Sequence, residues 1–455
     1  MKRGAFFFVL GFLFGISLQF AGGQGISSPR GPFAKTWDEA YARMSPFHGV
    51  RQPGTDPSTL NGKVICGYQG WFLAKGDGSG KGWVHYGPSD FKPGNCTVDL
   101  WPDMSEASPE ESYPTPFHFA DGTVATLFSS YNARTVNRHF KWMADYGIDG
   151  AFLQRFGGEL RSPGGYDHLN AILDNVRQGA NANGRTWAVM YDLSGLQEGQ
   201  IDSVVIEDWK RLVDRMEITK DPSYQKQNGK PVVTIWGVGF NEGRKYTLDE
   251  CARLIDFLKN DRKYGGNCVM LGVPYGWRDQ NRDAVKDPKL HDVILKADIV
   301  SPWTVGRYRT VDKFNQTMDQ YPKADLAWCQ QNKLDYMPVI FPGFRWHNLM
   351  KSHGKSPPYV DIDRLKGEFF KAQGNGLIAD GVNMLYVAMF DEIDEGTAIF
   401  KCTNNPPIGD SDFGTFDGMP PDTYLRLAGA FSQELKKQSS VTRLPKQKTF
   451  TLVCP

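Results

Sequence analysis

Four carboxylates stand directly after one apolar segment in the last quarter of the chain. Residues 384–390 carry no charge, and Asp391, Glu392, Asp394 and Glu395 follow them. An apolar run of this length is typical of a strand covered on both faces, and ligands bind where such strands end in α/β folds. Crowding several like charges there raises the pKa of at least one of them, which suits acid–base chemistry. The structural alternative is a solvated acidic turn.

A further acid, Asp192, ends a second apolar segment. It follows residues 187–191, and Gly195 then allows the chain to turn away. We therefore predict that Asp192 is one catalytic carboxylate and that Glu395 or Glu392 is the other. In the structural alternative, Asp192 hydrogen-bonds a neighbouring loop or the arginine of the preceding strand.

Aromatic and planar polar side chains accompany the predicted strand ends. Aromatic rings stack on the C–H faces of sugars, planar polar groups bind hydroxyls, and paired carboxylates act at the anomeric carbon. This combination predicts a carbohydrate site, although any one of these aromatics taken alone is more simply explained as core. The residues predicted to hold the sugar are Trp71, Gln154, Arg155, Tyr191, Trp236, Trp303, Arg345, Trp346 and Asp391, with Trp83 and His85 in a loop that covers it.

Eight β-rich apolar segments alternate with amphipathic helical segments beyond residue 60. Several of the helical segments begin at Asp, Ser or Thr and end near Gly, as capped helices do. Alternating strands and helices form parallel sheets, and eight such units indicate an α/β fold of the (β/α)8 type, the TIM barrel. A doubly wound open sheet is the alternative. The predicted strands span residues 64–72, 150–156, 186–193, 232–238, 268–273, 299–305, 337–341 and 384–390.

Two connections between these elements are unusually long. Residues 73–134 follow the first strand and residues 397–420 follow the eighth, so both would emerge at the C-terminal face of the barrel. Long loops in compact domains are usually functional. We predict a signal peptide at 1–23, an N-terminal extension at 24–60, a catalytic (β/α)8 barrel at 61–440 and a C-terminal tail at 441–455.

The first residues have the pattern of an export signal. Lys2 and Arg3 precede an apolar stretch at 5–20, and small residues follow at 21–23. The stretch is short and interrupted by glycines, so we predict cleavage, no membrane span in the mature protein, and a secreted or periplasmic location. Seven cysteines fit an oxidising compartment without defining a disulfide framework.

Composition argues against other broad classes of protein. The formal net charge of +1 gives no general attraction to nucleic acid or anionic lipid. The chain has no phosphate-binding loop, no nucleophile-elbow motif and no spacing of cysteines or histidines typical of zinc, so we predict neither a cofactor nor a metal. A metal-dependent hydrolase on the same barrel would need histidines clustered at strand ends, whereas the eight histidines are scattered. The oligomeric state stays open.

Several segments resemble glycoside hydrolase families 71 and 99, the group of endo-α-mannosidases, α-1,3-glucanases and xylosidase/arabinosidase-like proteins. Residues 64–72 with the loop at 83–85 resemble the opening strand and its Trp/His loop, residues 143–156 the next helix and strand, and residues 390–397 the final acidic motif. The run 395–397 is the most specific match. The resemblance covers most of the chain and implies a (β/α)8 fold that hydrolyses an α-linked oligo- or polysaccharide.

The same resemblance implies roles for three acids. Asp192 stands where family 99 has a catalytic Glu at the end of strand 3, and Glu392 and Glu395 stand on the acids of the last motif. The chain departs from the family at Gly195, where the family has a second Glu. Either Glu198 or the acids after the eighth strand take that role, or the mechanism differs. If activity has been lost, the chain would be a barrel that binds glycans without cleaving them.

Overall fold

The structure is a computed structural model, and it describes residues 31–442 of the chain. The predicted signal peptide and most of the predicted C-terminal tail lie outside these residues. A central parallel sheet contains strands from most of the described length. Its strands are β1 (Lys63–Tyr68), β4 (Gly150–Phe156), β5 (Thr186–Asp192), β7 (Lys230–Trp236), β8 (Cys268–Val273), β9 (Ile299–Pro302), β10 (Asp335–Tyr336), β11 (Val339–Ile340) and β14 (Met384–Val387).

The sheet curls so that the first strand of the chain lies beside the last. Its order is β10-β9-β8-β7-β5-β4-β1-β14-β11, with the short β6 (Lys226–Gln227) antiparallel to β7. β1 pairs in parallel with both β4 and β14, with Ile65 opposite Gly150 on one side and Tyr386 on the other. The predicted α/β class with a parallel sheet is therefore confirmed.

Only two residues of the predicted seventh strand, 337–341, form a strand, β11, and the short strand β10 lies just before the predicted range. β10 pairs with β9 and β11 pairs with β14, and the chain between them passes through Met337 and Pro338. Proline lacks a backbone N–H and cannot donate to a ladder. The Pro338 carbonyl still accepts a hydrogen bond of 3.1 Å from the Tyr386 N–H, and the Met337 N–H donates to the Val300 carbonyl at 2.9 Å.

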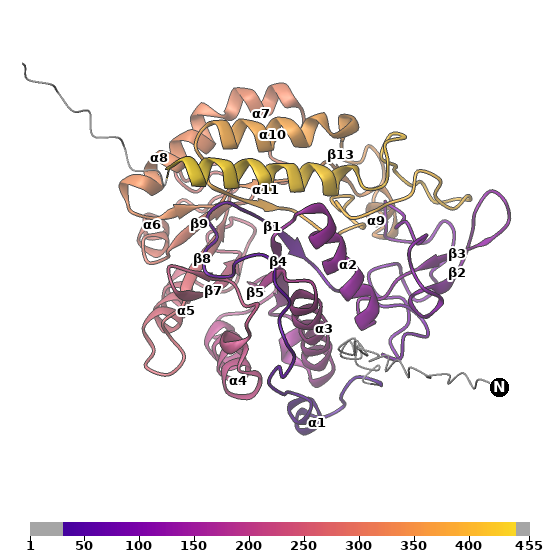
Figure 1. Cartoon of the computed structure of the whole chain (residues 1–455), viewed down its shortest axis with the longest axis horizontal. Coiled ribbons are helices and arrows are strands. Elements are labelled where there is room, and N and C mark those ends of the chain that lie inside the picture. The colour runs from indigo at the N-terminus through magenta and orange to yellow at the C-terminus, as the bar shows by residue number, and fades with distance from the viewer. Residues whose placement is uncertain (1–30, 443–455) are drawn as a thin grey trace, which may run out of the picture.

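Helices surround the curled sheet (Figure 1). Side chains cap the N-termini of several helices. Thr247 and Glu250 form a capping box at the N-terminus of α5, and Asn132 caps α2. Among residues 31–442, no helix has both the length and the apolar character to cross a membrane. The helices are α1 (Trp37–Ala42), α2 (Ala133–Tyr146), α3 (Pro163–Ala182), α4 (Glu207–Met216), α5 (Leu248–Asn260), α6 (Lys289–Ile294), α7 (Val311–Thr317), α8 (Ala324–Gln331), α9 (His347–Ser352), α10 (Glu368–Ala379) and α11 (Thr423–Thr442).

The two long loops pack against each other. The connection after β1 contains the hairpin β2 (Tyr113–His118) and β3 (Val124–Leu127), which extends from the body in Figure 1. Backbone bridges join this connection to the one after β14, at Pro102 with Cys402 and at His118 with Ile408. A third loop carries the small hairpin β12 (Phe344–Arg345) and β13 (Asp361–Ile362). These loops lie at the C-terminal ends of the strands of the central sheet.

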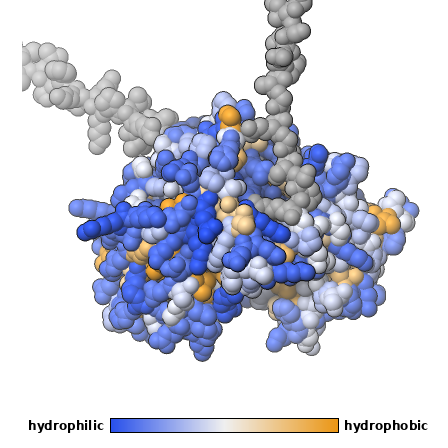
Figure 2. Space-filling view, turned by 90° about the horizontal axis from the view of Figure 1, so that it is seen from below, coloured by the Kyte–Doolittle hydropathy of each residue, from blue (hydrophilic) through white to orange (hydrophobic). Residues whose placement is uncertain are grey.

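The surface offers no extended apolar area on the face shown in Figure 2, which is mainly hydrophilic with apolar residues scattered over it. Large exposed apolar side chains are few in the described part of the chain, for example Val50, Val124 and Ile408. Single exposed apolar residues are normal for a folded protein.

Candidate active site

The alternation of side chains along β4 and β5 decides which residues face the interior of the curled sheet. Gln154 points inward, with its Nε2 3.4 Å from the Met190 sulfur. Arg155 points outward, where its guanidinium makes two hydrogen bonds of 2.6 Å with Asp208 of α4. The Tyr191 hydroxyl donates to the same carboxylate at 2.7 Å. The structure thus places Arg155 and Tyr191 in the helix layer, away from the open end, because strand side chains alternate with a period of two.

Asp391 has a structural position at the start of the acidic loop. Its two carboxylate oxygens accept hydrogen bonds from the backbone N–H groups of Gln69 at 2.8 Å and Gly70 at 2.9 Å. The side chain is fully buried, and burial raises its pKa to about 7. Asp391 therefore ties the end of β1 to the end of β14, and its carboxylate, which we predicted to hold the sugar, is fully buried and engaged by the backbone.

Glu392 and Glu395 lie together in the same loop. The Gln69 amide and the Thr397 hydroxyl each donate to one oxygen of Glu392. Burial, with the charges of Glu395 and Asp394, raises the pKa of Glu392 well above its usual value. Burial and the Asp394 charge raise the pKa of Glu395 to about 7. Like charges this close cannot both ionise freely, so the pair retains a proton near neutral pH.

A histidine stacked on a tryptophan borders this acidic loop. The His85 and Trp71 rings are parallel, with centroids 4.0 Å apart, and Trp71 also stacks on Phe156 at 5.2 Å. His85 Nδ1 lies 3.5 Å from a carboxylate oxygen of Asp394. The structure therefore brings the predicted loop residue His85 and the predicted strand-end residue Trp71 to the acidic cluster.

Several buried polar atoms at this end have no hydrogen-bond partner among the described residues. Buried polar groups are normally paired, so unpaired ones grouped at one end of a sheet indicate a place that a polar ligand completes. The atoms are Gln69 Oε1, Trp71 Nε1, Gln154 Oε1, Trp236 Nε1 and Asp394 Oδ1.

Asp192 belongs to a second group, at the ends of β5 and β7. Its Oδ1 accepts a 2.7 Å hydrogen bond from the Ser194 N–H, and burial raises its pKa. Arg244 donates to the Ser194 hydroxyl at 2.6 Å, and its guanidinium lies 5.2 Å above the Trp236 ring. Trp236 meets Trp303 edge to face at 5.5 Å. The two predicted tryptophans thus lie together beside Asp192.

Arg244 is a site residue that sequence reasoning missed. It lies in the loop after β7 and reaches Ser194 only through the pairing of β5 with β7. The glycines around it, at 237, 239 and 243, are the one local signal of an unusual loop.

The group at Asp192 and the acidic loop are separated by two intervening strands. β5 and β14 flank β4 and β1 in the sheet, which corresponds to roughly 14 Å measured along it. The charges that act on Asp192 are those of Arg244 and Glu242, whereas the charges of Glu395 and Asp394 act on Glu392. The acids whose charges act on one another are therefore those of the acidic loop, Glu392, Asp394 and Glu395, and Asp192 is not among them.

Arg345 holds loops together. Its guanidinium pairs with Asp361 at 3.0 Å, with Asp412, and with Asp99 at 3.5 Å. Asp99 is buried, which raises its pKa to about 8, and its carboxylate also accepts from the His347 N–H at 2.9 Å. Arg345 therefore anchors the loop after β14, and its donors are largely taken up by these carboxylates.

The two remaining predicted aromatics pack mainly against other rings in their own loops. Trp346 lies 5.0 Å from Phe344, centroid to centroid, and Trp83 lies 5.0 Å from Phe91. Both are only partly buried. No group of three or more potential ligands that could hold a metal ion occurs among residues 31–442.

The fold has clear relatives among solved structures. An endo-α-mannosidase of family GH99 from Bacteroides thetaiotaomicron, in complex with bis-tris-propane, matches with a TM-score of 0.59 at 14% identity, covering 84% of this chain and all of its own. A second structure of a GH99 endo-α-mannosidase from that organism matches with a TM-score of 0.58 at 15% identity, over the same shares of both chains. This chain has the fold of the GH99 glycoside hydrolases. The resemblance predicted from the strand ends is confirmed at the level of the fold.

A glycoside hydrolase-like protein also matches, with a TM-score of 0.50 at 13% identity over 85% of this chain and 97% of its own. No family model matches the sequence, and no curated protein matches it either. Identities this low relate the folds of these chains, so the chemistry of this chain has to be argued from its own site.

Proposed function

We propose that this protein is an exported glycoside hydrolase that cleaves an α-linked oligo- or polysaccharide. The observation that carries the proposal is the pair Glu392 and Glu395 in one loop at the C-terminal end of β14, the first buried and the second partly buried, with both pKa values raised. Enzymes that hydrolyse glycosides use two carboxyl groups, one protonated and one ionised. The GH99-like fold supports this proposal, as does the export pattern of the first residues.

The proposal includes a closed barrel. The segment that holds β10 and β11 would join β9 to β14 and complete a (β/α)8 arrangement, with the long loops on its C-terminal face. The acids and the stacked aromatics then border one opening. Sugar rings would stack on His85, Trp236 and Trp303, the indole N–H of Trp71 would donate to a sugar oxygen, and the free oxygen of Gln154 would accept from a hydroxyl.

The contacts of the two acids divide their roles. Gln69 and Thr397 donate to Glu392, and such donors favour a carboxylate at that position. No side chain among the described residues donates to the Glu395 carboxylate, which is also partly exposed. Glu395 would therefore carry the shared proton and give it to the glycosidic oxygen. Protonation of Glu395 removes a charge that raises the pKa of Glu392, which then acts as base or nucleophile.

The test is the release of reducing ends by residues 24–455 from a panel of α-mannans, α-glucans, arabinans and xylans. We expect release from at least one α-linked polymer, and its loss in Glu395→Gln and Glu392→Gln with melting temperatures that do not fall. Glu198→Gln, an exposed acid after β5, is the matched control and should retain release. Release that survives both loop substitutions would assign catalysis elsewhere, with Asp192→Asn as the next variant.

A glycan-binding barrel without hydrolysis is the second candidate, and Gly195 favours it. That residue is exposed with φ 76°, and no atom lies within 4 Å of the point where its Cβ would be, so the position lacks the acid that the family resemblance implies there. Calorimetric binding of a glycan that the protein never cleaves, unchanged in Glu395→Gln, would establish this alternative.

A further inference from the structure

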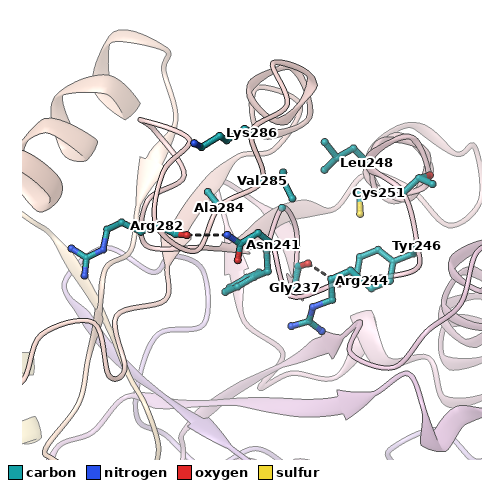
Figure 3. Close-up of a pocket in the computed structure, with 14 residues that line it drawn as sticks. Gly237, Asn241, Arg244, Tyr246, Leu248, Cys251, Arg282, Ala284, Val285 and Lys286 are labelled. Carbon is teal, nitrogen blue, oxygen red and sulfur yellow. Dashed lines mark hydrogen bonds between the residues drawn. The ribbon is translucent and has the colours of Figure 1, made fainter.

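Two loops enclose a cavity beside the Asp192 group. The cavity has a volume of 460 Å³ and lies between the loop after β7, the first turns of α5, and the loop after β8 (Figure 3). The loops are joined by backbone hydrogen bonds, from the Asn241 N–H to the Asp283 carbonyl and from the Val285 N–H to the Gly239 carbonyl, each 2.9 Å. Its walls are therefore held in place, and its size is within the range of small-molecule sites.

The walls of the cavity are mainly hydrocarbon. Tyr246 contributes its ring, because its hydroxyl donates to the Gly237 carbonyl at 2.7 Å. Two cations, Arg282 and Lys286, line the rim, but Figure 3 shows that their charged ends point away from the centre. No carboxylate lines the cavity. The apolar wall residues are Phe240, Tyr246, Leu248, Cys251, Ala284 and Val285.

Glycines make room for this cavity. At Gly237 the backbone φ is 114°, and an added Cβ would come within 2.8 Å of the Tyr246 hydroxyl oxygen. At Gly239 φ is 87°, and a Cβ would meet Leu290 at 2.4 Å. Both values lie in a region that L side chains rarely adopt. A loop of ordinary residues could not follow this path, so the hollow depends on these two positions.

Arg244 connects the cavity to the candidate active site. Its side chain lines the cavity, while its guanidinium leaves it to bind the Ser194 hydroxyl, two residues after Asp192. The same guanidinium covers Trp236, which meets Trp303 edge to face. A ligand that lies on these tryptophans would have the mouth of the cavity beside it.

We propose that this cavity is a subsite for a hydrocarbon group carried by the glycan, either an aglycone at its reducing end or an acyl ester on one of its hydroxyls. The apolar walls, the absence of lining acids and the shared residue Arg244 identify the class of ligand. The inference rests on the proposed function, because it takes the neighbouring group at Asp192 as part of a sugar site. It adds that the substrate is a substituted glycan or a glycoconjugate.

Calorimetry on residues 24–455 tests the subsite without turnover. Octyl and methyl α-D-mannopyranoside, and the corresponding α-D-glucopyranosides, are titrated below micelle formation. At least one octyl glycoside should bind about tenfold or more tightly than its methyl partner, since each methylene buried in the cavity adds favourable hydrophobic free energy. Methyl glycosides that carry an octanoyl ester at O6 separate the acyl source from the aglycone source.

Filling the cavity should remove this preference. Ala284→Phe and Val285→Phe each place a larger side chain in the wall of the cavity, at neighbouring positions. Each substitution should bring the octyl-to-methyl ratio of affinities close to one. Val124→Phe, at an exposed site on β3, is the matched control and should keep the wild-type ratio. Thermal melts show whether each filling variant is folded, and one folded variant is enough for the test.

Three results would overturn the subsite. Equal affinity for octyl and methyl glycosides in the wild type is one, and an octyl preference that survives both filling variants is another. The third is tighter binding of a methyl glycoside 6-sulfate that is lost in Lys286→Ala, because the ligand would then be an anion. Polysaccharide release without any octyl preference refutes the subsite alone, whereas octyl binding without any release refutes the proposed hydrolysis alone.

Discussion

The two ends of the sheet bury acids in opposite ways. At the N-terminal end, Asp149 is fully buried just before β4, and it accepts hydrogen bonds from the Val64 N–H at 3.0 Å, the Ser432 hydroxyl at 2.7 Å and the Lys436 ammonium at 2.6 Å. At the C-terminal end, Glu392 is buried and Glu395 is partly buried, with another acid nearby, and no cation from residues 31–442 pairs with either of them.

The different partners of these buried acids indicate different roles for the two ends of the sheet. A buried carboxylate with donors and a cation stabilises the fold through them, and removing it leaves its partner stranded. A buried carboxylate facing others of the same charge opposes folding, and its raised pKa is of use only for chemistry. The N-terminal end therefore holds the sheet together, and the C-terminal end is where we propose that the reaction takes place.

Removing one of the unpaired acids should have the largest effect on activity. Glu395→Gln is expected to lower kcat/KM roughly a hundredfold to ten-thousandfold, because the general acid is lost. Steady-state kinetics on the polymer found in the screen measures this. Asp149→Asn should leave activity in the surviving folded protein within a few-fold of wild type, and an equal loss in both variants would remove the contrast between the two ends.

Removing Asp149, the acid that is paired with a cation, should have the largest effect on stability. Asp149→Ala leaves two buried donors, the Val64 N–H and the Ser432 hydroxyl, without their acceptor and removes the partner of the half-exposed Lys436, so the free energy of unfolding should fall by about 2–5 kcal/mol. Urea denaturation measures the change. Asp145→Ala, which removes an exposed partner of Lys141, is the control and should cost less than about 1 kcal/mol.

Stability should depend on pH through the unpaired acids. The pKa of Glu395 is about 7 in the fold against an ordinary value of 4.5, so the folded state binds the proton more tightly than the unfolded chain does. This contribution is complete below about pH 4.5 and is lost as the pH rises through 7, an effect of roughly 3 kcal/mol. Melting temperatures across that range should fall less in Glu395→Gln than in wild type; parallel curves would contradict the burial of an uncompensated acid.

The smallest expected effect comes from Asp394, whose charge raises the pKa of Glu395. Asp394→Asn removes that charge, so the pKa falls and the proton on Glu395 is lost at lower pH. The alkaline limb of the kcat/KM profile should move toward lower pH, and activity above neutrality should decrease. Asp103→Asn, in the loop after β1, should leave the limb where it is. A limb that moves upward would show that Asp394 acts through contacts other than its charge.

Sequence pattern predicted the parts of the site that depend on one strand at a time. The apolar run at 384–390 indicated a buried strand with acids at its end, and β14 with its acidic loop confirms that placement. Trp71 was predicted as a strand-end residue of the site and His85 as a residue of its covering loop, and in the structure their two rings are stacked. Arg155 and Tyr191 were placed at the open end by position alone, although alternation along their strands turns them outward.

The sequence by itself determined most strands of the central sheet, that these strands are parallel, and that acids and aromatics gather where strands end; the short antiparallel strands β2, β3, β6, β12 and β13 were not predicted. Those properties are local, because they follow from apolar runs, capping residues and the alternation of strand with helix. Only the tertiary structure decided which acids face a cation and which face one another, since Asp149 meets Lys436 across 287 residues. It also decided that Arg244 reaches Ser194 and that two glycine-bearing loops enclose a cavity. Charge pairing and enclosed space depend on contacts between distant segments, which no local pattern records.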